Sequence, residues 1–289
     1  MKDIPTTFFL CLRNRFFDCE GKPIPFVLRD KASTQDDPFD EHLAAVVISE
    51  IQDMACIKAP GPLITPDLVV FRPSLCSGTA RDVLREDLQR IVGFEVKKLE
   101  RQPNGMVVRA SGLDYNTTPP CGHVRVYDET GAALDVRGFY VFACVERIPR
   151  QGCVVVTSLA VVDGDLLNAD FDFYLSIVGE REKRIGLGTY GDGADRTRPM
   201  LIFSNPLGIP ELNRGACLIH PSPEVPGGVR RVHVIKRTTK AATEAEFSVY
   251  RACEDVQGVE VSTLLDPMPV PLRNTKTRQR GRFLLPFRV

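Results

Sequence analysis

Apolar residues recur in this chain with two different spacings, and the dominant spacing changes near residue 105. Asp37 and Pro38 predict a helix start, because Asp caps helices and Pro is favoured at the first helical position. The apolar residues after them share one helical face: Leu43, Val47, Ile51 and Met54. Pro/Gly-containing residues 59–66 then end the helical pattern and lead into an apolar run.

Strand-like runs alternate with helical spacing up to residue 100. We expect a strand at 68–71, a second helix from about Ala80 to Val92, and a second strand at 94–99. From residue 105 onward, β-branched and aromatic runs predict mainly strands: 106–110, 123–128, 138–148, 153–162, 200–205, 228–237 and 247–252. The order helix, strand, helix, strand predicts an α/β layer structure with additional β-rich segments.

The length of 289 residues allows one large domain or two small ones. The Pro/Gly-rich stretch at 205–228 is the best candidate for a boundary, with a long loop as the alternative. We expect a single domain over 1–289. Lys+Arg and Asp+Glu balance at 37 each, so overall charge does not predict a nucleic-acid partner. A local basic surface is sufficient to neutralise phosphates, however, so a nucleic-acid partner is not excluded.

Nine cysteines occur without C-x-x-C spacing, and there are only four histidines, which argues against a structural zinc site. The odd number of cysteines fits reduced, mostly buried thiols in a cytosol. The start of the sequence has too short an apolar run for a signal peptide, and no apolar stretch approaches membrane-spanning length. We therefore expect a cytoplasmic protein without a membrane segment.

Charged residues lie inside or beside two of the predicted strands. Asp67 directly precedes the strand at 68–71, and Glu95 and Lys97 lie within the strand at 94–99. Because side chains alternate across a strand, Glu95 and Lys97 point the same way, and pairing of the two strands can bring Asp67 beside them. Two carboxylates and an ammonium suit a hard divalent cation next to a phosphate.

Phosphodiester hydrolysis requires charge neutralisation on the phosphate and an activated water. Asp67 and Glu95 are the candidate Mg²⁺ ligands, with the backbone carbonyl of Val96 as a further one. Lys97 is suited to contact the phosphate or to orient the attacking water. These residues form the candidate catalytic set.

Pro66-Asp67 followed by Glu95-Val96-Lys97 in a second apolar strand resembles the motif of the PD-(D/E)XK nuclease superfamily. The sequence around it, GFEVKKLER and then SGLDYNTTPPCGHVRVYD, looks like type II restriction endonucleases, and the resemblance covers roughly residues 60–130. It implies a central mixed β-sheet flanked by helices, a restriction-endonuclease-like core at about 37–165. It also implies Mg²⁺ dependence, cleavage of double-stranded DNA to 5′-phosphate and 3′-hydroxyl ends, and a homodimer. An upstream helical acid sometimes joins such sites, which makes Glu50 a candidate additional acid.

Ordinary structural roles compete with these interpretations. Asp67 after a proline can be a turn residue, Glu95 and Lys97 can be a solvated cross-strand pair, and Glu50 can be a solvent-facing helix residue. The conjunction favours a site, because acidic residues inside strands this apolar require compensation.

Candidate DNA-recognition elements lie at about 111–122 and 181–289. Polar loops and basic stretches there can hydrogen-bond bases or neutralise phosphates, although each can equally be an ordinary loop or a solvated surface. The candidate contacts are Tyr115, Asn116, Thr117, Arg184, Arg196, Arg198, Arg278 and Arg280.

The sequence thus predicts a Mg²⁺-dependent, sequence-specific endonuclease of double-stranded DNA. A two-fold dimer would supply one site for each strand of a palindromic target. Two alternatives remain open: a repair or structure-specific nuclease with the same core, and a non-catalytic DNA-binding protein.

Overall fold

The computed structural model describes most of the chain, in segments separated by gaps. The described residues are 2–32, 37–61, 64–101, 103, 105, 107–109, 122–148, 152–167, 209–225, 227–238, 244–256, 258–266 and 282–288. The helices are α1 (Ile4–Phe16), α2 (Pro38–Glu50), α3 (Pro73–Cys76) and α4 (Arg81–Glu86), with 3₁₀ turns η4 (Pro210–Leu212) and η5 (Cys253–Asp255).

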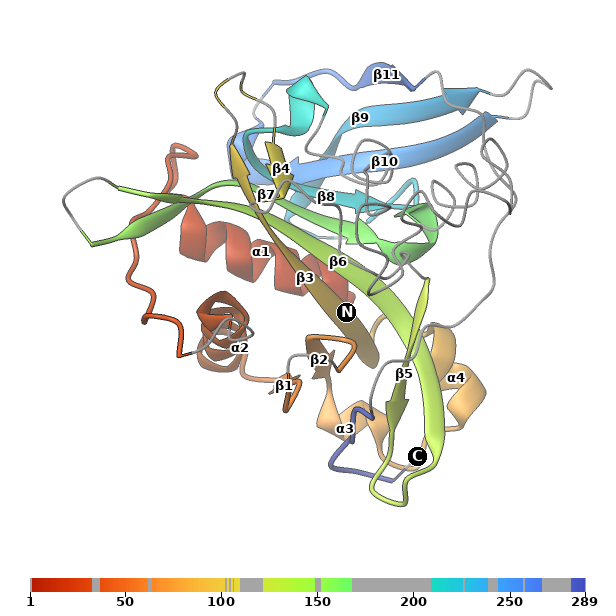
Figure 1. Cartoon of the computed structure of the whole chain (residues 1–289). Coiled ribbons are helices and arrows are strands. Elements are labelled where there is room, and N and C mark those ends of the chain that lie inside the picture. The colour runs from red at the N-terminus through yellow and green to blue at the C-terminus, as the bar shows by residue number, and fades with distance from the viewer. Residues whose placement is uncertain are drawn as a thin grey trace, which may run out of the picture.

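One large mixed sheet dominates the molecule (Figure 1). Its strands run in the spatial order β1-β2-β3-β6-β7-β8-β10-β9-β11, with β4 attached to β3 and β5 attached to β6. β3 and β6, β7 and β8, and β9 and β11 pair in parallel, whereas the other pairs are antiparallel. The strands are β1 (Ala55–Lys58), β2 (Leu68–Phe71), β3 (Ile91–Arg101), β4 (Val107–Arg109), β5 (His123–Tyr127), β6 (Ala133–Arg147), β7 (Val154–Asp163), β8 (Gly215–His220), β9 (Val229–Thr238), β10 (Glu244–Ala252) and β11 (Ser262–Asp266).

The chain is therefore a mixed α/β protein with a large central mixed sheet and few helices among the described residues, and the coarse fold prediction is confirmed. α2 begins as expected, because Asp37 caps it by accepting a hydrogen bond from the backbone N–H of Phe39 at 3.1 Å. The prediction of a helix over 80–92 is wrong. α4 ends at Glu86, and β3 already begins at Ile91, because a turn closed by Arg90 N–H on the Asp87 carbonyl separates them. The stretch 205–228 contains β8, which pairs with β7 and β10 inside the sheet.

The main hydrophobic core lies between one face of the sheet and the two long helices. α1 contacts β3, β7 and β8, and α2 packs against α1 and β1 (Figure 1). Phe8 of α1 stacks on Phe94 of β3, with 4.0 Å between the ring centroids. Since Phe94 and Val96 belong to this core, the side chains of Glu95 and Lys97 point to the opposite face of β3.

The C-terminal end of the chain is fastened to β5. Phe283 and Leu285 are buried. Tyr127 N–H donates to the Phe283 carbonyl, and Leu285 N–H donates to the Tyr127 carbonyl. Phe287 packs on Phe71 of β2, with 5.0 Å between the ring centroids. The described residues 282–288 thus complete a separate apolar cluster with residues of β2, α3, α4, β5 and β6.

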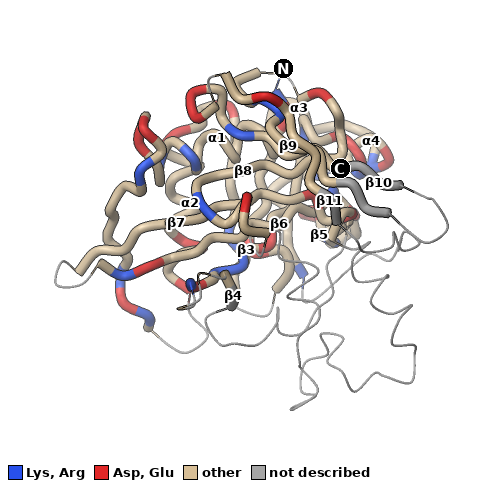
Figure 2. Tube along the Cα trace, turned by 90° about the horizontal axis from the view of Figure 1, so that it is seen from above, with Lys and Arg blue, Asp and Glu red and all other residues tan. Residues whose placement is uncertain are grey.

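Basic and acidic residues are interspersed along the described trace (Figure 2). No described helix is both long enough and apolar enough to cross a membrane. The described cysteines are all free thiols, and four of them are buried: Cys56, Cys76, Cys144 and Cys217.

Candidate metal and active site

Asp67 lies where β2 parts from β3. The antiparallel pairing of these strands ends at Leu68 opposite Phe94, so extending the register by one position places Asp67 opposite Glu95. The Asp67 carboxylate turns toward β3 and accepts a hydrogen bond from the backbone N–H of Val96, at 2.7 Å. On the other side, the Asp67 carbonyl accepts a hydrogen bond from Ala59 N–H at 2.8 Å. Asp67 is therefore held by backbone groups on both sides and is more than a turn residue.

Glu95 and Lys97 form a buried ion pair on one face of β3. The ammonium of Lys97 donates to Glu95 Oε1 at 2.8 Å, and the two residues are only 5% and 6% exposed. A solvated cross-strand pair is excluded, because both residues are on the same strand and away from water. The structure thus brings the three predicted catalytic residues into one region. The Asp67 carboxylate accepts from the N–H of Val96, the residue between Glu95 and Lys97.

A short stretch of the β3 edge separates two strand partners. β6 occupies one edge of β3 from Gly93 to Leu99. On the other edge β2 pairs only as far as Phe94, and β4 begins at Leu99. Among the described residues, the registers of β2 and β4 therefore leave positions 95–98 between them on this second edge. Because the N–H and C=O of one strand residue project toward the same neighbour, the Val96 carbonyl faces this edge together with its N–H.

The donor set at this edge fits a hard cation. Two carboxylates and a backbone carbonyl are oxygen ligands of the kind Mg²⁺ takes, with waters and substrate phosphate completing its shell. No group of three or more His, Cys, Asp or Glu side chains arranged to hold a metal occurs within the described part of the chain. The site would therefore depend on two carboxylates plus Val96 and external ligands.

Gly93 allows the surrounding elements to close in on this region. A Cβ at this position would lie 2.4 Å from Val124 Cγ2 of β5 and 3.0 Å from the Pro66 ring. Both distances are shorter than real Cβ contacts, so only glycine lets β5 and Pro66 approach the same point of β3. The residue before Asp67 and the first residues of β5 consequently lie together, two positions from Glu95.

Of the α2 acids, Asp40 lies within electrostatic reach of Asp67, Glu95 and Lys97, while the role of Glu50 stays a prediction. Glu50 is exposed at the far end of α2, where its charge acts on Cys11. The first turn of α2 instead lies beside β3, since Lys98 Nζ is 3.8 Å from Asp37 Oδ1. Burial, followed by the negative charges of Asp67 and Asp37, raises the pKa of Asp40 to about 8.

This pKa means that Asp40 keeps its proton at neutral pH. The charges of Lys97 and Glu95 also act on it, in opposite directions, which places it within electrostatic reach of the predicted site. Two sequence signals could have pointed to it: Asp40 is an acid in the first turn of α2, and α2 is the helix before the Asp67 strand, with only β1 between them.

The predicted DNA contacts lie outside the described residues. This holds for the loop contacts Tyr115, Asn116 and Thr117 and for the arginines Arg184, Arg196, Arg198, Arg278 and Arg280. Their role stays a prediction from the sequence. The described residue Gly122, which follows the first of these segments, packs against Asp165, since a Cβ on it would lie 1.6 Å from Asp165 Oδ1.

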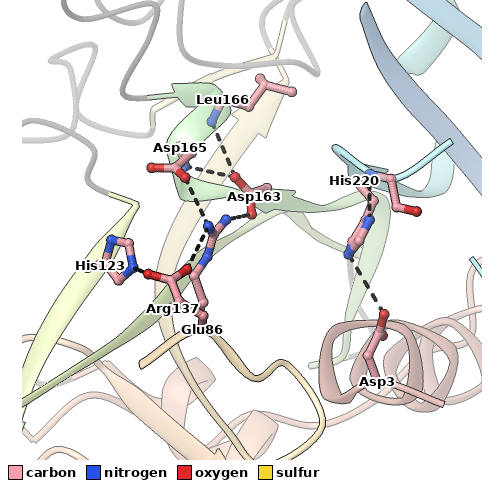
Figure 3. Close-up of polar contacts among 9 residues, drawn as sticks. Asp3, Glu86, His123, Arg137, Asp163, Asp165, Leu166 and His220 are labelled. Carbon is pink, nitrogen blue, oxygen red and sulfur yellow. Dashed lines mark hydrogen bonds and ion pairs between the residues drawn. The ribbon is translucent and has the colours of Figure 1, made fainter. Parts of the chain in front are cut away.

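A second charged cluster, which the sequence did not predict, lies near the start of β6 and the end of β7 (Figure 3). The guanidinium of Arg137 bonds Asp163 and, at 2.9 Å, Asp165, and its Nη1 lies 3.7 Å from Glu86. His123 Nε2 is 2.9 Å from the other oxygen of Glu86. Burial raises the pKa of the fully buried Asp163 even though Arg137 opposes the shift. This cluster joins α4, β5, β6 and the end of β7 into one network.

His220 of β8 lies across from this network (Figure 3). Its Nδ1 accepts a hydrogen bond from the backbone N–H of Ser222 at 3.1 Å, so the neutral ring carries its proton on Nε2. Nε2 faces Asp3 Oδ2 at 3.7 Å, and Asp3 in turn caps α1 through Thr6 N–H. Burial lowers the pKa of His220, which keeps the ring neutral. Its neighbours therefore give it a structural role at the start of α1.

Comparison with known proteins adds no assignment. No protein-family model matches this chain, and neither the curated proteins nor the solved structures yield a match. The function of this protein is therefore inferred from the geometry of the site and from the motif resemblance.

Proposed function

We propose that this protein is a Mg²⁺-dependent endonuclease that cleaves double-stranded DNA at a specific sequence, with a restriction-endonuclease-like core. The proposal depends on one observation. Val96 N–H donates a hydrogen bond to the Asp67 carboxylate, and the residues on either side of Val96 form the buried Glu95–Lys97 ion pair. Burying charged groups in a sheet costs free energy even when they are paired. This set also has the composition that phosphodiester hydrolysis requires.

Each residue has a role in the proposed reaction. Asp67, Glu95 and the carbonyl of Val96 would hold Mg²⁺, which when bound neutralises phosphate charge and acidifies its water ligand. Lys97 would contact the phosphate and orient the attacking water. Asp40 would hold a proton next to the carboxylates.

The wider proposal follows from the chemistry of duplex cleavage. Two strands must be cut, and a two-fold dimer would supply two equivalent sites. The segments at 111–122 and 181–289 would provide the base and phosphate contacts. The products would be fragments with 5′-phosphate and 3′-hydroxyl ends.

The test is digestion of a mixed-sequence plasmid with Mg²⁺, followed by sequencing of the fragment ends. We expect defined fragments from the wild type and at least a 100-fold slower rate in Glu95→Gln, because that variant loses a metal-binding carboxylate. DNA binding should persist in Ca²⁺. The control is Glu100→Gln, which changes an acid of the same strand on its other face and should cleave normally.

Three outcomes would count against the proposal. Full activity of Glu95→Gln would remove the site. Cleavage only at nicks, mismatches or junctions would favour a repair nuclease. Tight DNA binding without cleavage under any divalent cation would favour the non-catalytic alternative.

A further inference from the structure

Lys97 has an unusual position for a surface-type residue. Its side chain is 7% exposed and that of Glu95 is 6% exposed, and the ammonium lies 2.8 Å from Glu95 Oε1. The neighbouring Lys98 differs, because its side chain is 29% exposed and contacts Asp37 on the other face of β3. Only one of two adjacent lysines is thus directed at the candidate metal ligands.

The ammonium lies 2.8 Å from Glu95 Oε1, where it occupies the side of this carboxylate that a bound cation would use. Glu95 is a proposed ligand, and Asp67 occupies the next position on the adjacent strand. Two neighbouring carboxylates repel each other unless a cation lies between or beside them. The ammonium of Lys97 supplies that cation from within the chain, at the distance of a charge-assisted hydrogen bond.

We propose that Lys97 is the resident cation of this site: its ammonium takes the place of the divalent cation beside Glu95 and moves off this carboxylate when the metal binds. The inference rests on the proposed function, because it assumes that Glu95 binds a metal. The lysine side chain has a flexible four-carbon stem, so its ammonium can move off Glu95 without a change in the backbone of β3.

The movement couples metal binding to substrate binding. A displaced ammonium leaves a favourable partner and stays near the incoming cation, so metal binding to the protein alone is weakened. The phosphate of the substrate gives the ammonium a new partner and removes this penalty. Metal and DNA therefore strengthen each other's binding by the same factor.

The experiment measures Ca²⁺ affinity of the full-length protein by calorimetry without DNA. Lys97→Met removes the resident ammonium, and we expect Ca²⁺ to bind at least 10-fold more tightly than to the wild type. Lys98→Met is the matched control, with the same loss of charge one residue away, and should change the affinity less than 2-fold. Equal or weaker binding by Lys97→Met would overturn the inference.

A measurement on the wild type covers the case in which Lys97→Met does not fold. The side-chain NMR signal of Lys97, assigned by its disappearance in Lys97→Arg, should shift during a Ca²⁺ titration with the midpoint of metal binding. A signal that stays in place while Ca²⁺ binds would overturn the inference, because the ammonium would then have remained on Glu95.

Glu95→Gln separates this inference from the proposed function. If Ca²⁺ binding disappears in Glu95→Gln but is unchanged in Lys97→Met, the metal site stands and the resident-cation role falls. If no divalent cation binds through Glu95 in any variant, the proposed function falls, and this inference falls with it.

Discussion

Replacing Gly93 by alanine tests whether the close approach of three elements builds the site. The added methyl group would lie 2.4 Å from Val124 Cγ2, whereas carbon atoms in contact are about 3.5 Å apart or more. One of them must therefore move by about 1 Å. Neither neighbour yields easily, since valine is stiff at χ1 and the second contact is a proline ring.

We expect Gly93→Ala to lower the free energy of unfolding by about 2 to 3 kcal/mol, the upper part of the range for overpacked cores. For a chain of 289 residues, that corresponds to a fall in Tm of about 3 to 5 °C. Displacement of Pro66 also moves Asp67 away from Val96 N–H, so the variant should bind Ca²⁺ at least 10-fold more weakly at temperatures at which it remains folded. Thermal unfolding and calorimetry measure the two effects.

Two further variants make this result decisive. Val124→Ala removes the atom with which the new methyl group collides, so the double variant should be at least about 1 kcal/mol more stable than additivity predicts. Gly61→Ala is the control, because its nearest neighbour would be Ile64 Cδ1 at an ordinary 3.9 Å. An unchanged Tm in Gly93→Ala, or strictly additive behaviour of the pair, would refute the reasoning.

Three other substitutions probe buried ionisable side chains by thermal or urea unfolding across pH. Asp40→Asn should stabilise the metal-free protein by about 2 to 4 kcal/mol at pH 7. The reason is that between pH 3.8 and about 8 only the unfolded wild-type chain releases the Asp40 proton, which favours unfolding. The stability gain should vanish near pH 3.5. Because the pKa of His220 is lowered in the folded protein, its contribution to wild-type stability is complete above pH 6.5 and falls below that pH, where the unfolded chain gains a proton. His220→Asn should therefore show a flatter dependence of the free energy of unfolding on pH. Equal slopes for the two proteins would contradict this prediction. Arg137→Leu should cost about 3 to 5 kcal/mol by leaving the Asp163 charge buried without its guanidinium, and Asp163→Asn in the same chain should restore part of that loss.

Local signals in the sequence were sufficient for much of the fold. Asp37-Pro38 located the start of α2 to the residue, because capping is decided by neighbours in the chain. The alternating apolar runs located β2, β3 and the long strands after residue 105 for the same reason.

Predictions failed where a local pattern allowed two outcomes. The helical spacing of Leu84, Leu88 and Ile91 fits a helix up to residue 92, but pairing of β3 with β2 draws Ile91 and Val92 into the sheet. α1 was missed although its signals were present, with Asp3 as the cap and Phe8, Phe9, Leu12 and Phe16 on the buried face.

The proximity of Asp67, Glu95 and Lys97 could be predicted from the sequence, but their surroundings could not. Asp67, Glu95 and Lys97 followed from strand alternation and from the motif. The choice between Asp40 and Glu50 depended on which end of α2 lies beside β3, and only tertiary packing decides that. The Arg137 network depends likewise on four elements that meet only in the folded chain.

The early end of β2 explains why the site lies where it does. Pro66 has no N–H to donate, so β2 cannot continue its pairing with β3 beyond Leu68. The Asp67 carboxylate replaces the missing strand partner by accepting from Val96 N–H. Val96 N–H anchors the carboxylate, and Ala59 N–H anchors the Asp67 backbone carbonyl. Asp67 should therefore stay in place when Glu95 or Lys97 is substituted, so that each of those variants reports on one side chain alone.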